Sequence, residues 1–383
     1  SKERTWKTYK RRIRGASLPY ELFYEILLRL PVKTLGRFKA VCKAWFAIIS
    51  SPSFIRLHLK QSASRHDLVP SFLITPHTLN SVIDDEYWPS TFSSNIPFYC
   101  WQDGQDIASL MHATDFHWEF GSVYRMSHCH GLVMLPTDTK IYVFNPATSD
   151  VLELPDGQKD IIKFQAPGLG LDLGTNSYKV VRTFYSLMGM EVFTIGAHDS
   201  CWRLVEDPPY PVMHQEPMHF KGSLLWYILE DLPESSEGFL RFDLEVETFS
   251  FISCPVLASH EQVDFAELDG ELCLAQYLSS EIVIWKSPSG GNHQWHRFYV
   301  INLLETWKFR LFTNFRIDCV LLRHDNRVYR YNKASRTAEE VVCVEQLRYK
   351  NSKADNFDFV GHDIYFFNII PYTESLISLS RAR

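Results

Sequence analysis

The sequence predicts an α+β protein in which a small N-terminal three-helix bundle precedes an all-β propeller of about six blades. Apolar residues recur at helical spacing up to about residue 60. From about residue 69 this spacing fades, and short β-rich runs appear between turn residues. Within the β-rich part a pattern of strands repeats with a period in the forties, which is typical of propeller blades.

Three short helical runs are expected within residues 18–59. Pro31 ends the first run, because proline lacks an amide hydrogen and clashes with the preceding turn. A bundle of about 45 residues rarely has enough core to be stable alone. The bundle is therefore either docked on the rest of the chain or completed by a partner. The apolar positions of the runs are Leu22, Ile26, Leu27 and Leu30; Leu35, Phe38 and Val41; and Trp45, Ile48 and Ile49.

The β-rich part predicts strands at 71–75, 132–135, 141–145, 178–185, 191–195, 223–229, 239–244, 271–276, 282–286, 327–332 and 363–369. One aromatic residue of each repeat aligns, at intervals of 49, 49, 43 and 46 residues. These residues are Phe144, Phe193, Phe242, Trp285 and Tyr331. The alternative, a β-sandwich, fits neither the regular period nor roughly 310 residues of strands. Residues 68–120 then supply the first blade, and the chain end is expected to close the ring.

The charge is divided unevenly along the chain. Residues 1–60 hold 14 Lys/Arg against 3 Asp/Glu, a net charge of +11, and the remainder holds 25 against 42, a net charge of −17. The expected organisation is a basic tail over 1–16, the helical domain over 17–62 and the propeller domain over 68–383. The basic cluster Lys10–Arg14 is interpreted as a solvated tail, with a nuclear import signal as the alternative.

Composition indicates a soluble globular protein, with 22% charged and 45% hydrophobic residues. The sequence has no run of eighteen apolar residues and no secretory signal at its start. Its eight cysteines form no C-x-x-C pair and several lie in apolar runs, which favours reduced core thiols. We therefore expect a cytoplasmic protein, with the nucleus as an additional location.

A dense set of residues in the helical segment resembles the F-box, the motif that docks a substrate receptor onto the adaptor of an SCF-type ubiquitin ligase. Gly36 departs from the family, which more often has an apolar residue there. Glycine in an exposed helix costs about 1 kcal/mol relative to alanine. The matching residues are Leu18-Pro19, Leu22, Glu25-Ile26-Leu27, Leu30-Pro31-Val32-Lys33, Leu35, Arg37-Phe38-Lys39, Val41-Cys42-Lys43, Trp45 and Ile48.

This resemblance implies binding to a Skp-type adaptor and, through it, to a cullin and a RING subunit. Some of the implied contact residues must instead pack the helices together, and the sequence does not divide the two roles. The implied adaptor contacts are Leu18, Pro19, Leu22, Ile26, Leu30, Pro31, Leu35, Phe38, Val41 and Trp45.

The β-rich part resembles the F-box-associated domain of plant F-box proteins, a kelch-like propeller, and within them the S-locus F-box-like group. The order of the matches behind an F-box carries the resemblance. His130 departs from it, because the family usually has asparagine at that turn. The matches are His130-Gly131-Leu132, 145–148, 168–172, 178–182, 221–227, 242–245 with Glu247 and Phe249, 268–270 with 272–274, Ile284-Trp285 and 371–379.

The sequence predicts no catalytic residue, no metal and no cofactor. It has no Walker A loop, G-x-G-x-x-G, H-E-x-x-H or G-x-S-x-G motif. His128 and His130 would share one face of a strand, but no second ligand pair at zinc spacing accompanies them. The acidic clusters near residues 84, 230 and 339 lie in polar, turn-like contexts and are interpreted as solvated charge.

Aromatic residues in expected loops are candidates for binding a protein substrate, because exposed aromatics on a rigid scaffold are frequent in protein-binding faces. For each of them a core position is the alternative interpretation. The candidates are Tyr87, Trp88, Trp101, Trp307 and Tyr349.

Together these features favour a non-catalytic substrate receptor of a ubiquitin ligase. Its target would be a protein, and the negative propeller favours a basic one. Neither a nucleic acid nor a membrane is an expected partner. Two alternatives stay open: a propeller enzyme or glycan-binding lectin with an incidental helical cap, and an F-box scaffold that acts outside ubiquitination.

Overall fold

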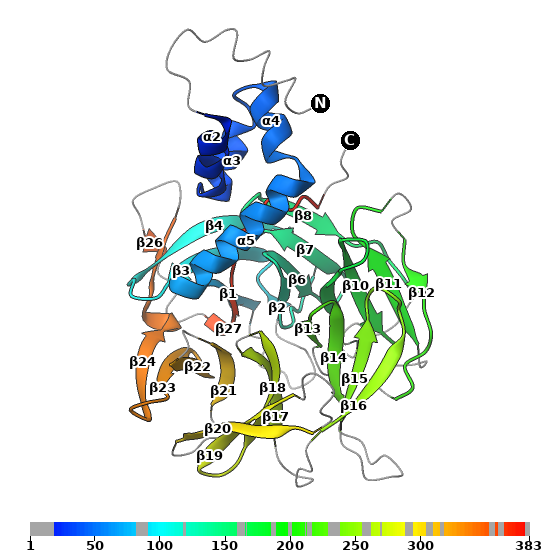
Figure 1. Cartoon of the computed structure of the whole chain (residues 1–383), viewed down its shortest axis with the longest axis vertical. Coiled ribbons are helices and arrows are strands. Elements are labelled where there is room, and N and C mark those ends of the chain that lie inside the picture. The colour runs from blue at the N-terminus through cyan, green and yellow to red at the C-terminus, as the bar shows by residue number, and fades with distance from the viewer. Residues whose placement is uncertain are drawn as a thin grey trace.

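The protein is described here from a computed structural model, and in its described residues four α-helices precede a six-bladed propeller (Figure 1). The fold class and the blade number predicted from the sequence are thereby confirmed. The structure describes residues 19–379 except 82–90, 118–119, 159–164, 166, 185–188, 198–200, 211, 213–216, 229–237, 255–261, 269, 288–293, 304–308, 315–317, 352–356 and 359–363.

The first three helices are α2 (Tyr20–Leu28), α3 (Val32–Phe38) and α4 (Lys43–Ile49), and they match the three predicted runs. Proline residues directly precede two of them, Pro19 before α2 and Pro31 before α3. Proline has no amide hydrogen, which is tolerated at the start of a helix because the first amides have no partner within it.

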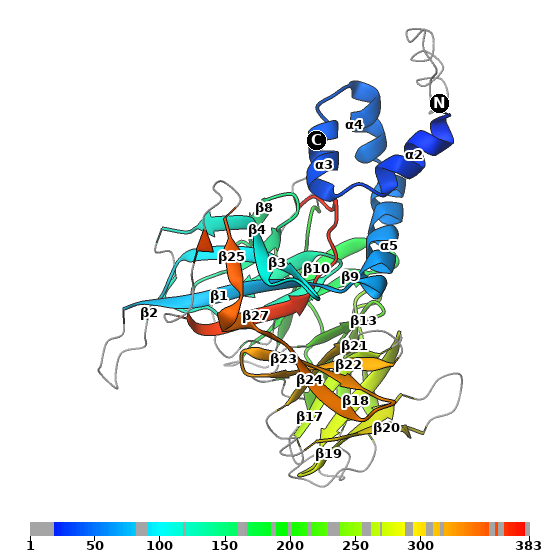
Figure 2. The same cartoon turned by 90° about the vertical axis from the view of Figure 1, so that its left-hand side faces the viewer.

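A fourth helix, α5 (Pro52–Leu68), was not predicted, and it runs beyond residue 62. Its buried side chains include Phe54, His58 and Ser62, which lie four residues apart on one face. Because two of these three are polar, the face shows no apolar periodicity in the sequence. His58 is satisfied by a 2.9 Å hydrogen bond between its Nε2 and the Leu30 carbonyl oxygen. Figure 2 shows α5 leading from the other helices down to the propeller.

Five of the six sheets have four antiparallel strands each, taken in chain order. The strands are β5 (Ser127–Cys129), β6 (Leu132–Pro136), β7 (Ile141–Asn145) and β8 (Asp150–Glu153); β9 (Gly168–Asp172), β10 (Ser177–Thr183), β11 (Met190–Thr194) and β12 (Arg203–Leu204); β13 (Met218–Phe220), β14 (Ser223–Ile228), β15 (Gly238–Asp243) and β16 (Phe249–Ser253); β17 (Gln262–Leu268), β18 (Glu271–Tyr277), β19 (Glu281–Lys286) and β20 (His296–Asn302); and β21 (Arg310–Asn314), β22 (Cys319–His324), β23 (Arg327–Asn332) and β24 (Thr337–Cys343).

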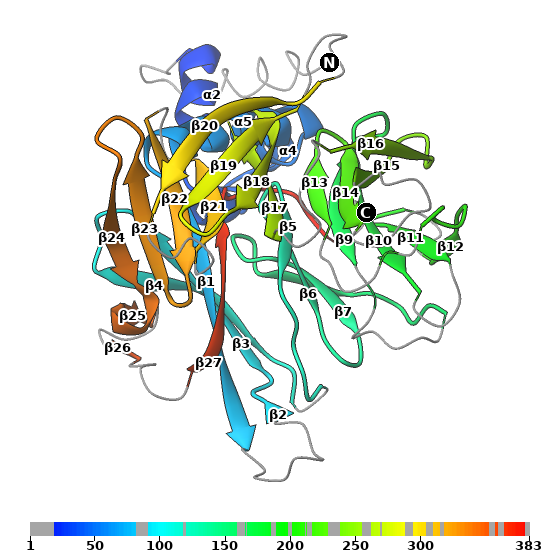
Figure 3. The same ribbon diagram turned by 90° about the horizontal axis from the view of Figure 1, so that it is seen from below.

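The sixth sheet closes the ring with both ends of the propeller domain. β1 (Ser71–Ser81) pairs with β3 (Asn95–Gln102) on one side and with the C-terminal β27 (Ile364–Pro371) on the other. The sheet continues through β4 (Ile107–Asp115), and three short strands extend it. This arrangement confirms that the first residues of the β-rich part and the chain end share one blade (Figure 3). The short strands are β2 (Thr91–Phe92), β25 (Arg348–Lys350) and β26 (Phe357–Asp358).

Several hairpins in the propeller use the same turn chemistry. A residue with an Asx side chain ends the strand and accepts hydrogen bonds from the backbone two or three residues on, as Asp243 Oδ1 does from Glu245 and Val246. Four residues after it, a residue adopts positive φ, which returns the chain to the sheet. The pairs are Asn145 and Ser149, Asp172 and Asn176, Asp243 and Glu247, and Asn332 and Arg336.

The propeller core is divided among the blade interfaces. In the described residues, each of six apolar clusters lies between two neighbouring sheets, and a seventh fills the helical bundle. Of the five aligned aromatics, Trp285 is partly buried and the other four are buried almost completely. Each blade therefore buries one face against its neighbour, as the repeat in the sequence predicts.

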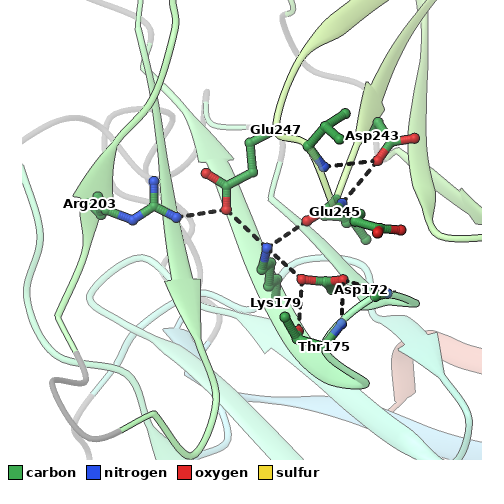
Figure 4. Close-up of polar contacts among 10 residues, drawn as sticks. Asp172, Thr175, Lys179, Arg203, Asp243, Glu245 and Glu247 are labelled. Carbon is green, nitrogen blue, oxygen red and sulfur yellow. Dashed lines mark hydrogen bonds and ion pairs between the residues drawn. The ribbon is translucent and has the colours of Figure 1, made fainter.

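A buried ionic network joins the β9–β12 blade to the next one (Figure 4). The Lys179 ammonium on β10 lies 2.8 Å from Asp172 and 2.9 Å from Glu247, and it donates a hydrogen bond to the carbonyl oxygen of Leu244. Arg203 on β12 binds the same Glu247 oxygen at 2.6 Å. Because Glu247 and Leu244 belong to the β15–β16 turn, one lysine connects two blades.

Candidate functional site

The helical bundle presents large apolar side chains to solvent. Leu22 and Ile26, one turn apart on α2, are 53% and 46% exposed. Val41, before α4, and Phe46, on α4, are 59% and 56% exposed. These four exposed side chains of the bundle are here together called the apolar face, and the protein's own strands leave each of them exposed. The bundle therefore carries apolar surface that a partner could bury.

The structure divides the remaining predicted adaptor contacts into exposed and internal ones. Pro19 and Pro31 are exposed, while Leu30, Phe38 and Trp45 are partly buried and pack against the bundle core. Leu35 is fully buried in that core, so placing it at a partner contact was wrong. Helical spacing alone cannot distinguish adaptor contact from packing within the bundle. It shows which residues of α3 share a face, but not that this face is buried inside the bundle. Leu18 lies outside the described residues.

The C-terminal segment 372–379 holds the bundle on the propeller. Leu376 is buried in the bundle core together with residues of α2, α3 and α5. Glu374 accepts a 3.1 Å hydrogen bond from the Val32 amide at the start of α3 and lies 3.9 Å from Arg65 on α5. Burial raises the pKa of Glu374, and the bond from Val32 partly offsets this.

Residues of the propeller also hold segment 372–379 in place. The Asn145 side chain at the end of β7 donates hydrogen bonds to the backbone carbonyls of Ser375, at 3.0 Å, and Ile377, at 2.7 Å. A Cβ atom at Gly131 would lie 2.3 Å from the Thr373 carbonyl oxygen, so this position requires glycine. Asn145 and Gly131 both belong to stretches that resemble the F-box-associated domain. Their contacts with segment 372–379 explain why an asparagine and a glycine stand at these positions.

The loop aromatics predicted as substrate contacts are not supported as a group. Trp101 and Tyr349 are buried in the core between the β21–β24 blade and the ring-closing blade, so assigning them to a binding face was wrong. Each polar tip is satisfied internally, by the Gln105 and Val344 carbonyl oxygens respectively. Tyr87, Trp88 and Trp307 lie outside the described residues.

The histidines considered as metal ligands lie in and beside β5. Burial lowers the pKa of His128 to about 4, with smaller contributions from His130 and His66. His130 adopts a φ of 50° in the turn after β5, a conformation in which asparagine is also frequent. Across the part of the chain that the structure describes, no group of three or more His, Cys, Asp or Glu residues is arranged to hold a metal ion. In the same part, no helix is long and apolar enough to cross a membrane.

Comparison with known families matches both parts of the chain. The profile of the F-box domain matches residues 16–57, and that of the F-box associated beta propeller domain matches residues 91–346. The second match alone covers well over half of the sequence.

Similar plant proteins carry F-box in their names, and some also carry kelch-repeat. The F-box/LRR-repeat/kelch-repeat protein At1g09650 of Arabidopsis thaliana is 31% identical over 75% of this chain and 78% of its own length. F-box protein At5g10340 of the same plant is 27% identical over 76% and 70%, respectively. The F-box/kelch-repeat protein At3g17280 is also 27% identical, over 63% of this chain and 60% of its own length.

Solved structures resemble the chain only distantly. The nidogen/laminin complex matches 78% of this chain and 98% of its own chain, with 11% identity and a TM-score of 0.43. The hydrazine synthase of Kuenenia stuttgartiensis matches with 8% identity and a TM-score of 0.44. A similarity this weak says nothing about activity. The family profiles and the plant relatives, taken with the helical bundle and the six blades, show that this chain belongs to the F-box proteins that carry an F-box-associated β-propeller domain.

Proposed function

We propose that the chain is the substrate-recognition subunit of an SCF-type cullin–RING ubiquitin ligase. In this proposal the bundle binds a Skp-type adaptor and the propeller binds a target protein inside the cell. The observation that carries it is the apolar face, which stays exposed although the core of the bundle is packed and includes Leu376 of segment 372–379. Membership of the F-box family supports this assignment.

The proposed contribution of the chain to catalysis is proximity. It brings no reactive group of its own, but holds a target near a ubiquitin-loaded enzyme, which turns a bimolecular encounter into an intramolecular one. The attachment of segment 372–379 suits this role, because a bundle fixed on the propeller holds the two partners in one geometry. The net charge of −17 over residues 61–383 favours a basic target through electrostatic steering.

We expect the double variant Leu22→Glu/Ile26→Glu to bind a Skp-type adaptor about 30-fold more weakly, since it places two charges in an apolar contact. Co-purification and calorimetry with the full-length chain measure this. The matched control, Leu173→Glu/Leu204→Glu, changes two similarly exposed leucines on the propeller and should leave adaptor binding unchanged. Equal binding by both variants would reject the docking assignment.

The ubiquitination step requires a separate measurement. Target proteins are first identified by capture with the wild-type chain in cells whose proteasome is blocked. Without the block, we expect these proteins to have longer half-lives when the Leu22→Glu/Ile26→Glu variant replaces the wild-type chain. Captured proteins whose half-lives do not change would favour a scaffold that acts outside ubiquitination.

A further inference from the structure

A cavity of about 480 Å³ lies at the junction of the bundle and the propeller. Helix α3 forms one wall, the turn between β7 and β8 forms another, and segment 372–379 contributes Leu376 and Ser378. Ligand pockets typically measure roughly 300–1,000 Å³ and often lie at domain interfaces. The size and place of this cavity therefore suit a small molecule.

The wall formed by α3 is strongly cationic. Lys33, Arg37 and Lys39 all line the cavity, and in the described ranges none of them forms an ion pair. A single carboxylate belongs to the lining, that of Asp150 at the start of β8. Three cations against one anion leave the cavity with excess positive charge, and the neighbouring Ser149 hydroxyl can donate a hydrogen bond. The Thr148 hydroxyl already donates to the Asn145 carbonyl oxygen at 3.4 Å.

Gly36 adds no side chain to the cavity lining along α3. A Cβ atom built on Gly36 would meet nothing within 4 Å, and the residue itself lines the cavity. Because Gly36 lies in the lining, we expect a larger side chain at this position to take up part of the cavity.

We propose that this cavity binds a small anionic molecule carrying phosphate groups, which bridges the F-box and the propeller. Arginine and lysine are the residues that recognise phosphate, and a site shared by two domains lets one ligand stabilise their junction. The ligand would touch α3 and the β7–β8 turn at once, so its binding should strengthen the attachment of the bundle.

The titration of Lys39 agrees with this geometry. Burial lowers the pKa of Lys39, and Asp150 offsets this only in part. Asp150 therefore compensates the charged form of this lysine only in part. A bound phosphate would supply the missing negative charge.

Inorganic pyrophosphate is the probe for the test, applied to the full-length chain. We expect it to raise the melting temperature saturably, beyond the effect of sodium chloride at the same ionic strength. The variant Arg37→Gln/Lys39→Gln should bind at least about tenfold more weakly by calorimetry. The control Arg56→Gln/Lys60→Gln removes the same charge from the exposed face of α5 and should bind like wild type.

A second pair of variants tests the cavity itself. Gly36→Leu fills the space without changing charge and should abolish pyrophosphate binding, whereas Gly36→Ala should retain it. This pair decides the question even where the charge variant folds poorly. Three results would overturn the proposal: no saturable shift in wild type, equal weakening in both charge variants, or undiminished binding by Gly36→Leu.

Discussion

Replacing Lys179 with methionine is expected to lower the free energy of unfolding by about 3–5 kcal/mol, because a buried charged pair loses one partner. Asp172 is almost fully buried and would keep only its hydrogen bonds within its own turn, from Gly174 and Thr175. Glu247 would still contact Arg203. Chemical denaturation of the full-length chain measures the loss. Lys60→Met, at an exposed position on α5, is the matched control and should cost little.

The pH dependence of the stability lost in Lys179→Met tests whether the loss comes from the charged carboxylates of Asp172 and Glu247. Burial by itself raises the pKa of Asp172, but bonds from Lys179 and Thr175 outweigh it and hold the pKa below its usual value. The same holds for Glu247 with Arg203 and Lys179. A carboxyl with a depressed pKa stabilises the fold above its unfolded pKa, and this contribution disappears as the pH falls through the folded pKa. The difference between wild type and Lys179→Met should therefore be full at pH 7 and shrink as the pH falls below about 4.

A neutral version of the network offers a second check. Asp172→Asn/Lys179→Met/Glu247→Gln removes the charges of all three residues and should recover part of the lost stability. If the triple variant is no more stable than Lys179→Met, the loss comes from packing rather than from unpaired charge.

Replacing Leu376 with alanine is expected to cost about 2–5 kcal/mol, the usual price of a large-to-small change in a packed core. Leu376 is 2% exposed and packs in the bundle core, although it lies far along the chain from the helices. Because this side chain joins the two domains, the loss should fall on the attachment of the bundle. Limited proteolysis should then cut the helices of the variant faster than its propeller strands.

The matched control is Leu173→Ala, the same substitution at an exposed propeller position. It should leave both stability and the cleavage pattern close to wild type. A Leu376→Ala variant whose helices resist protease as wild type does would show that the bundle is held by other contacts, such as the bond between Glu374 and Val32.

Local chemistry made much of the fold predictable. Pro31 separates two helices, the Asx residues end strands, and the period set by aromatics such as Phe144 and Phe193 is that of the blades. These features depend on residues close together in the chain. Helix α5 was missed because its buried face carries His58 and Ser62, and an apolar pattern cannot reveal polar residues that are satisfied by tertiary contacts.

The sequence by itself determined the F-box segment, the propeller class and the alternation of strands, because periodicity records which residues share a face. Only the tertiary structure decided what covers each face: it buried Leu35, Trp101 and Tyr349 and left Leu22 exposed. It also joined Val32 to Glu374 across 342 positions of the chain. Such contacts depend on how separate elements pack together, and a linear pattern carries no record of that packing.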